Sequence, residues 1–537
     1  MRTPLAGSRP VPLLAWAGFL VAAVALAACG AGQRGPSGAP EGLFARGLDQ
    51  IGELYIEPVS TRRLALAGIA RLSRLDDKLS IGSSGDVRLG EALGLVYDSR
   101  SIAVYSPPAD GNNRDWGELV GNVVGAARSA SPRLASMPQD AVEKAVFDGM
   151  TSALDRYSRY ATPKTATNQR AARDGYSGIG VTLEGSGNGF RIAALCPRGP
   201  AEQAGVRPED ALLAVDGVPT AGRAQDDVMD QLRGPLGSTV SVRVQRAGTA
   251  QMRDLQLKRA FVTLPTVTTS RQGNIAIFRI AGFNQSTTQR LGEELAEVRR
   301  QARGQLAGIV LDLRGDPGGL LDQAVSIADL FIANGPIVST TGRHPASHQA
   351  FTASGHAKAP DIPIAVLING GSASASEIVA AALQDRGRAV VIGSSSYGKG
   401  SVQTVLHLPN SGELILTWAQ LVTPSGYHLQ SHGVVPTLCT SGLGDDEASI
   451  QLALQRVGGA AGAVSRRGLD DQGWARLRQS CPGRETKPAI DLKLAERLLS
   501  DPRLYSQALR GIQSAPAWLQ TLRPRLDSRS RRLIFPA

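Results

Sequence analysis

The chain has 537 residues, of which 42% are hydrophobic and 4% aromatic, and its formal net charge is +11. This length allows about three or four domains with their own cores. The low aromatic content and the lack of a nucleic-acid-reading motif argue against a nucleic-acid-binding protein. The positive excess is concentrated after residue 440, which predicts a solvated basic surface or one attracted to an anionic membrane or cell-wall polymer.

The first 28 residues have the features of a secretory signal peptide. Arg2 and Arg9 supply a positive start, and an apolar run over 11–28 follows. The run ends in Leu26-Ala27-Ala28-Cys29, which resembles the lipobox of bacterial lipoproteins. The resemblance implies cleavage before Cys29 and lipidation of that cysteine. An uncleaved transmembrane anchor is the alternative.

Residues 29–42 are rich in Gly, Ala and Pro and predict a flexible tether. Together with the lipobox they imply a periplasmic protein held to a membrane by lipid. Gly30 rather than Asp follows the cysteine, which favours the outer membrane over the inner one.

Residues 43–170 predict a helical N-terminal region. Leu64, Ile69, Leu72 and Leu75 recur near the helical period, and a second helix is expected over 139–154. Within the Gly-, Ser- and Pro-rich stretch 80–113, a short apolar strand is expected over 101–105.

Residues 171–262 change to short alternating strands separated by turns, with two short helices. Their order of features resembles a PDZ domain. Tyr176-Ser177-Gly178-Ile179-Gly180-Val181 matches the carboxylate-binding loop, and the stretches 198–205 and 212–217 match the central signature. The resemblance implies that the N–H groups around Gly178, Ile179, Gly180 and Val181 hold a terminal carboxylate, while the adjacent strand edge pairs with an extended peptide. A PDZ fold that only packs and binds no peptide is the alternative.

Residues 263–440 alternate strands and helices, which predicts an α/β layer with crossover connections. Two Gly- and Ser-rich segments stand out, one around Ser374 after a buried strand and one around Lys399. A serine at a strand-to-helix turn lies where free backbone N–H groups favour a developing negative charge. A buried, neutral lysine could serve as the base of that serine.

These segments resemble the carboxy-terminal processing peptidases, serine endopeptidases with a PDZ domain and a Ser–Lys dyad. The motifs are Leu311–Gly319, Ser372–Ile378 and Tyr397–Gln403, in the order of the family. Residues 441–537 lie outside the resemblance and predict a basic helical region, either a small capping domain or a partly disordered tail. The resemblance implies an α/β peptidase core of the crotonase/ClpP-like class, with the PDZ domain inserted in it or preceding it. It implies no cofactor.

Carried over motif by motif, the resemblance implies that Ser374 is the nucleophile, that Lys399 is the base and that Gln403 orients the amine of Lys399. The oxyanion hole is expected to use the N–H of Ala375 and one N–H from Gly318 or Gly319. Ser372 and Ser376 are expected to cap backbone N–H groups. Asp385 is either a functional aspartate or a solvated charge at a helix end.

The segments 154–158 and 432–437 depart from the pattern of the family, and neither is expected to touch the dyad.

The four cysteines and six histidines limit which disulfides and metal sites the chain can form. In an oxidising compartment, two of Cys196, Cys439 and Cys481 can pair, and we favour Cys439 with Cys481. No metal-ligand spacing is present in the sequence, so we expect no metal site.

The expected partners are apolar C-terminal tails of periplasmic proteins, with an adaptor protein possible and the oligomeric state open. The final apolar residues 533–537 could themselves occupy the PDZ domain. Two rival functions remain: a catalytically silent PDZ scaffold or binding protein, and a ligand-binding relative of the same fold.

Overall fold

A computed structural model describes all residues outside 1–41, 84–91, 188, 456, 458–467 and 514–537. The predicted signal peptide, the lipidation of Cys29 and the apolar end 533–537 lie outside the described residues. Across the described part of the chain, no helix has the length and apolar character needed to cross a membrane.

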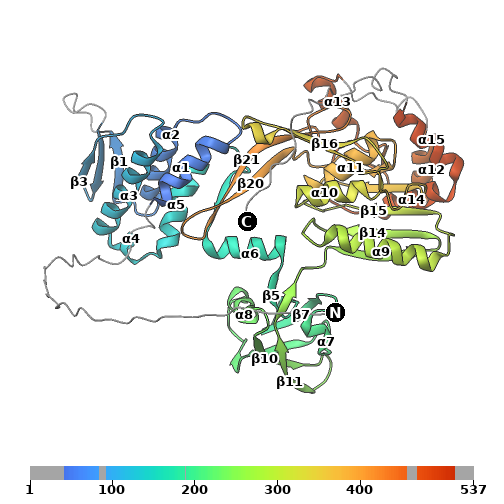
Figure 1. Ribbon diagram of the computed structural model, residues 1–537, viewed down its shortest axis with the longest axis horizontal. Helices are drawn as coiled ribbons and strands as arrows, with labels where there is room; N and C mark the ends of the chain where they lie inside the picture. Colours follow the sequence, from blue (N-terminus) through green and yellow to red (C-terminus); the bar gives the residue numbers. More distant parts are fainter. Residues whose placement is uncertain (1–41, 84–91, 188, 456, 458–467, 514–537) are drawn as a thin grey trace, which may run out of the picture. The chain divides into compact units, whose positions relative to one another are not determined.

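The glycine turn and the Ser374 turn follow strands of a six-stranded sheet, of which Figure 1 labels β14 and β15. Its order is β13-β14-β15-β18-β19-β22, parallel from β14 to β22, with β13 antiparallel at one edge. The strands are Val267–Gln272, Ile275–Ile280, Gly308–Asp312, Ile364–Ile368, Val390–Gly393 and Leu438–Cys439. Successive side chains point to opposite faces of a strand, so a wholly apolar strand such as β18 needs cover on both faces.

Helices cover both faces of this sheet. Phe278, Leu311 and Val366 pack on one face with α9 (Thr287–Ala302), α10 (Leu321–Asp329) and α11 (Ala375–Asp385). Ile277, Val310 and Leu367 pack on the other face with α12 (Glu447–Gln455), α14 (Ala489–Ser500) and α15 (Pro502–Gln513). The helices α12, α14 and α15 therefore form the second helical layer of the core, whereas Trp474 of α13 (Asp471–Ser480) packs with the residues of the first face.

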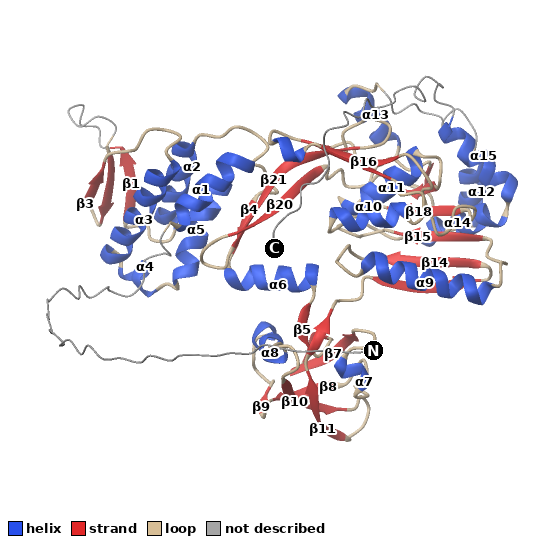
Figure 2. Ribbon diagram, in the orientation of Figure 1, coloured by secondary structure: helices blue, strands red, loops and turns tan. Residues whose placement is uncertain are grey.

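A second sheet, with the order β17-β16-β21-β20, carries the lysine side of the site (Figure 2). Its strands are Gln349–Thr352, Pro336–Thr341, Glu413–Val422 and Ser401–His407. The short strand β4 (Arg159–Ala161) also pairs with β21, with Arg159 opposite Ile415. This pairing brings residues just after the N-terminal helices to the strands that follow Lys399.

The N-terminal region is not helical throughout. Its helices are α1 to α6, Leu43–Leu54, Thr61–Ala70, Asn113–Ala130, Pro132–Ser136, Gln139–Thr151 and Pro163–Asp174, with a 3₁₀ turn at Arg71–Arg74. A three-stranded antiparallel sheet interrupts them, with β1 (Leu79–Ser83), β2 (Leu93–Tyr97) and β3 (Arg100–Tyr105). The strand expected over 101–105 is β3. The strands β1 and β2 were missed because Gly and Ser residues mask the alternation that buries Leu79, Leu93 and Leu95.

The segment that resembles a PDZ domain has its own apolar core and a sheet of order β11-β10-β8-β7-β6, with β9 beside β8. In chain order these strands, β6 to β11, are Val181–Ser186, Gly189–Leu195, Ala211–Val215, Val218–Pro219, Thr239–Gln245 and Met252–Lys258. Two short helices, α7 (Pro200–Gln203) and α8 (Gln225–Leu232), complete it. The strands β5 (Tyr176–Gly178) and β12 (Ala260–Val262) pair where the chain enters and leaves this segment.

Substitution of Gly149 tests the packing of α2 on α5. A Cβ atom at Gly149 would lie 2.3 Å from the Ala67 carbonyl oxygen, so Gly149→Ala should lower the free energy of unfolding by about 1–3 kcal/mol. Gly125 on α3 is the matched control, because a Cβ there meets nothing within 4 Å. Gly125→Ala should raise stability by up to about 1 kcal/mol. Urea denaturation followed by circular dichroism measures both, and equal effects of the two substitutions would contradict this packing.

Candidate active site

Ser374 occupies the turn between β18 and the start of α11. Its backbone angles are φ 57° and ψ −113°, a conformation that residues other than glycine rarely adopt. Such local strain persists only where the surrounding structure holds it, and it occurs often at functional sites. The residue is half-buried. The tight turn thus presents a serine hydroxyl at a helix N-terminus, as the sequence predicts.

Glu377 connects the serine turn to the lysine loop. Its side chain is fully buried, and its carboxylate accepts hydrogen bonds from the backbone N–H groups of Ser374 (2.7 Å), Gly398 (2.7 Å) and Lys399 (2.9 Å). The hydroxyl of Ser396 donates a fourth bond. Burial raises the pKa of Glu377, while these four donors oppose the rise. One carboxylate therefore fixes the backbone of both candidate catalytic residues.

Glu377 was missed in the sequence analysis although the sequence contains a signal for it. Ser374-Ala375-Ser376-Glu377 has the spacing of a capping box, in which the glutamate side chain accepts from the N–H of the N-cap residue.

Lys399 lies just before β20 and is half-buried. Burial lowers the pKa of its amine, and the positive charge of Arg159 lowers it further. The carboxylates of Glu377 and Asp155 oppose this effect. A lowered pKa increases the neutral fraction of the amine near pH 7, which a general base requires.

Of the segments 154–158 and 432–437, which are both expected not to touch the dyad, the first does touch it. The Nζ of Lys399 lies 5.2 Å from the centre of the Tyr157 ring, and the Arg156 guanidinium lies 4.8 Å from the same ring. Pairing of β4 with β21 brings these residues there, which no local sequence pattern reveals. The N–H of Val434 donates to the Ser396 hydroxyl at 2.7 Å, so the second segment supports the lysine loop.

Gln403 does not hydrogen-bond to Lys399 in the described structure. Its amide nitrogen donates to the hydroxyls of Ser401 (2.9 Å) and Thr417 (3.3 Å). Gln403 nevertheless lines the same cleft as Lys399.

The glycine turn approaches Ser374 closely. A Cβ atom at Gly318 would lie 2.8 Å from the Ala375 nitrogen and 2.9 Å from the Ser374 Cβ, so only glycine fits there. The N–H of Gly318 already donates to the Asp316 carboxylate at 2.8 Å. Within the described part of the chain, the N–H groups of Gly319 and Ala375 have no acceptor. Of the two candidate glycines, Gly319 is therefore the one with a free donor.

Asp316 is a further group of this turn that the sequence analysis did not single out. Only 1% of it is exposed, and burial raises the pKa of its carboxyl to about 7. One oxygen accepts from Gly318, while the other is buried without a hydrogen-bond partner among the described residues.

Ser374 and Lys399 line one cleft of about 680 Å³. Its walls come from the glycine turn, from β20 and β21, from the segment 264–266 and from α6. Most of the lining is apolar, including Leu320, Ile378, Val402, Val405 and Ile415. A cleft of this size can hold several residues of an extended peptide.

The other residues predicted from the sequence have structural contacts. The Ser372 hydroxyl accepts from the Asn369 N–H, as a capping serine does, whereas the Ser376 hydroxyl donates to the Asp316 carbonyl. Asp385 accepts from the N–H and the hydroxyl of Ser425.

Cys439 and Cys481 form a disulfide, which is the pair that the sequence analysis favours, and Cys196 is free and buried. Over the described residues, no group of three or more His, Cys, Asp or Glu side chains could hold a metal ion.

Comparison with known proteins assigns the family. The model of peptidase family S41 matches residues 274–439, and a PDZ-domain model matches residues 191–246. The carboxy-terminal-processing protease of Bartonella bacilliformis is 38% identical over 302 residues, which are 56% of this chain and 69% of that protein. The chain belongs to the carboxy-terminal-processing proteases. The resemblance drawn from the motifs is therefore confirmed, and the protein is a serine-type peptidase with a PDZ domain.

Two further proteins are similar to this protease. A probable CtpA-like serine protease of Staphylococcus aureus is 32% identical over 331 residues, which are 58% of this chain and 66% of that protein. The solved structure of a photosystem II D1 C-terminal processing protease is 27% identical, with a TM-score of 0.34, and the match covers 70% of this chain and 92% of that chain.

Removal of the Arg159 charge tests the electrostatics of Lys399. Because this charge lowers the pKa of Lys399, Arg159→Ala should raise that pKa and move the acid limb of the pH profile of kcat/KM to higher pH. Each unit of such a shift reduces the neutral amine about tenfold at pH values below the pKa. Arg159→Lys retains the charge and should leave the limb in place, as should Arg114→Ala on the exposed face of α3. A limb that stays in place in Arg159→Ala would contradict this assignment.

Proposed function

We propose that the protease cleaves peptide bonds with Ser374 as nucleophile and Lys399 as general base, through an acyl-enzyme. The observation that carries this proposal is the Glu377 carboxylate. It holds the backbone N–H groups of both residues at 2.7 and 2.9 Å, at one cleft that both residues line. The lowered pKa of Lys399 supports its role as the base.

In this mechanism, the neutral amine of Lys399 accepts the proton of the Ser374 hydroxyl as the oxygen attacks the peptide carbonyl carbon. The resulting ammonium group returns the proton to the leaving amine, the C–N bond breaks, and the acyl group remains on Ser374. A water molecule then attacks the ester carbonyl carbon while Lys399 accepts one of its protons. The ester C–O bond breaks, the ammonium group returns the proton to the Ser374 oxygen, and the second product leaves as an acid.

The oxyanion of each tetrahedral intermediate requires donors in fixed positions. We assign this role to the free N–H groups of Ala375 and Gly319. Ala375 is the first residue of α11, so the helix dipole adds to the stabilisation of negative charge. The bond from Gly318 to Asp316 holds the turn in the conformation that leaves the N–H of Gly319 free.

The PDZ domain is proposed to bind apolar C-terminal tails of exported proteins. Ile179 and Gly180 have N–H groups without an acceptor in the described part of the chain, as a carboxylate-binding loop requires. Val181, Leu183 and Met229 line a neighbouring groove of about 280 Å³ between β6 and α8, beside α6. The Gln225 amide donates to the Leu183 carbonyl at 3.2 Å, so a peptide that pairs with β6 would replace this bond.

We further propose that the protease acts in the cell envelope, anchored by lipid on Cys29 and facing the periplasm. The sequence of residues 1–42 supports this location. The alternation of strands and helices, with helices on both sheet faces, supports a crotonase/ClpP-like class for the core.

The test of the catalytic proposal is degradation of an unstructured protein with an apolar C-terminus by the full chain. Ser374→Ala and Lys399→Ala should each lower kcat by about 10³-fold or more, because the reaction then lacks its nucleophile or its base. Ser129→Ala and Lys144→Ala change the same residue types at exposed positions of α3 and α5 and should retain activity. Cleavage that persists in both site variants would contradict the proposal. A cellular phenotype that is unchanged in Ser374→Ala would favour the catalytically silent PDZ scaffold.

The PDZ assignment has its own test. Met229→Lys places a charge in the apolar groove and should weaken binding of a fluorescent apolar tail peptide at least about tenfold, because a charged side chain disfavours burial of an apolar partner. Met252→Lys is the matched control, since Met252 is 61% exposed on β11. Fluorescence anisotropy measures both, and equal affinities of the two variants would mean that tails bind elsewhere.

A further inference from the structure

A segment after the family match touches three loops of the candidate site. This segment, Arg478–Asp491, runs from the end of α13 to the start of α14, whereas the peptidase model ends at residue 439. Three loops contact it: the nucleophile loop 369–372, the lysine loop 394–398 and the glycine turn 314–318.

The nucleophile loop rests on the backbone of the segment. The Gly370 N–H donates to the Arg484 carbonyl at 2.7 Å, and the Asn369 amide donates to the carbonyls of Glu485 and Thr486 at 2.8 and 3.1 Å. The oxygen of the same amide accepts from the Gly315 N–H at 2.7 Å. Asn369 is therefore held by the segment while it holds the glycine turn.

The lysine loop and the glycine turn make direct contacts as well. Arg478 donates to the Ser396 carbonyl at 2.9 Å, and the Arg484 N–H donates to the Ser394 hydroxyl at 3.1 Å. Arg314, the first residue of the glycine turn, donates to the Pro488 carbonyl and to the Asp491 carboxylate at 3.0 and 3.2 Å. A Cβ atom at Gly483 would lie 2.8 Å from the Ser395 carbonyl oxygen, so the two backbones are in close contact.

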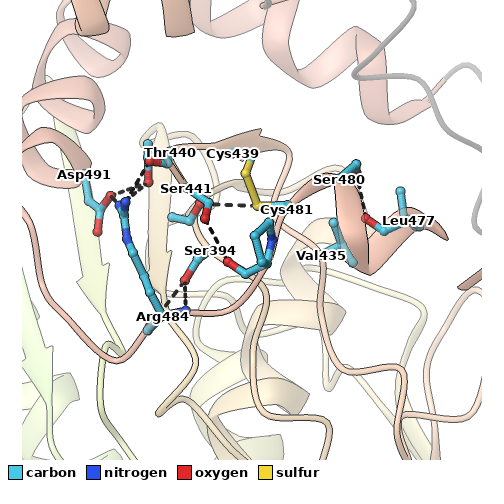
Figure 3. The surroundings of a disulfide bond; sticks show 12 residues. Ser394, Val435, Cys439, Thr440, Ser441, Leu477, Ser480, Cys481, Arg484 and Asp491 are labelled. Carbon is cyan, nitrogen blue, oxygen red and sulfur yellow. Dashed lines mark hydrogen bonds and ion pairs between the residues drawn. A yellow bond between two sulfur atoms is a disulfide. The ribbon is translucent and has the colours of Figure 1, made fainter. Parts of the chain in front are cut away.

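A disulfide and two hydrogen bonds fasten the segment to the core (Figure 3). The disulfide joins Cys481 to Cys439, the last residue of β22. The Arg484 guanidinium donates to the carbonyl and the hydroxyl of Thr440, both at 2.8 Å, and to the buried Asp491 carboxylate at 3.1 Å. The anchor points Cys439 and Thr440 are neighbours at the end of the sheet.

We propose that Arg478–Asp491 is a positioning element of the active site, and that the Cys439–Cys481 disulfide fastens it so that the rate of catalysis depends on this bond. The segment touches no residue that reacts; it acts through the loops that carry Ser374, Lys399 and the oxyanion donors. This inference rests on the proposed roles of Ser374 and Lys399. A displacement of about 1 Å in a catalytic group can reduce a rate about 10²-fold. Release of this segment from the loops should therefore lower kcat more than it raises KM.

Hydrogen exchange of the full chain, before and after reduction with dithiothreitol, tests the positioning without relying on activity. Two electrons and two protons from dithiothreitol convert the disulfide to two thiols, while dithiothreitol closes to its cyclic disulfide. Reduction should speed exchange about tenfold or more in peptides covering 369–376 and 394–400 and leave the range 191–246 within about twofold. Unchanged exchange in both loops would overturn the proposal even if the protease cleaves as proposed.

Kinetics of variants complete the test. Cys439→Ser/Cys481→Ser should lower kcat at least about tenfold with KM within about threefold, and dithiothreitol should have no further effect on it. Cys196→Ser should match the wild type before and after reduction, because burial raises the pKa of that thiol to about 11 and it forms no disulfide. A folded double variant with wild-type kcat would refute the role of the disulfide.

Arg484 provides a second arm that leaves the disulfide intact. Arg484→Ala should lower kcat in the same way, whereas Arg484→Lys should recover part of it because one charge-assisted bond can form again. Arg497→Ala removes an exposed pair with Glu447 on the same helical layer and should have no effect. If Arg484→Ala and Arg497→Ala behave alike, the segment has no positioning role. If the oxidised wild type does not cleave the substrate, the proposed function is contradicted. The hydrogen-exchange measurement does not depend on cleavage, so it still tests the positioning role.

Discussion

The active site depends on one buried carboxylate. Glu377 belongs to the helix that follows Ser374, yet its oxygens bind N–H groups on both sides of the proposed dyad. Desolvation of a carboxylate is costly, and here four donors offset part of that cost. Because the bonds end on backbone atoms, they fix the path of both loops rather than the rotamer of one side chain. The strained conformation of Ser374 can persist because its N–H is held in this way.

The layers of the fold explain why so much chain is needed around two residues. The central sheet ends at the serine turn and the glycine turn, so its helices α10 and α11 define one wall of the cleft. The second sheet provides the lysine side, and β4 and the residues just before it add Arg159 and Tyr157 from the N-terminal region. The helices after residue 440 cover the opposite face of the central sheet and bring Arg478–Asp491 to the loops. The two proposed catalytic residues thus depend on contacts from the N-terminal region, from both sheets and from the segment between α13 and α14.

Local sequence patterns predict the parts of this site that are local. Ser374, Lys399 and the glycine turn stand in Gly- and Ser-rich segments at strand ends, and the PDZ loop has its glycines next to a strand, so motif and spacing were sufficient to place these segments at turns. Glu377 follows from a capping box that could have been recognised. Tyr157 and Asn369 could not be assigned, because strand pairing and contacts far along the chain decide their roles. Gln403 shows that a motif can predict a position without predicting the contact made there. It lies where the motif places it, but its amide donates to Ser401 and Thr417 and not to Lys399.

The central claim is that Lys399 acts as a base because the fold lowers the pKa of its amine. The most direct measurement is an NMR titration of the full chain with ¹³C-labelled lysine, in which Lys399→Arg identifies the resonance of Lys399. The account predicts that this resonance titrates clearly below the value of an ordinary lysine, about 10.4, and moves upward in Arg159→Ala. A Lys399 resonance that titrates with the exposed lysines would contradict the account, because the amine would then be protonated where the protease is proposed to act.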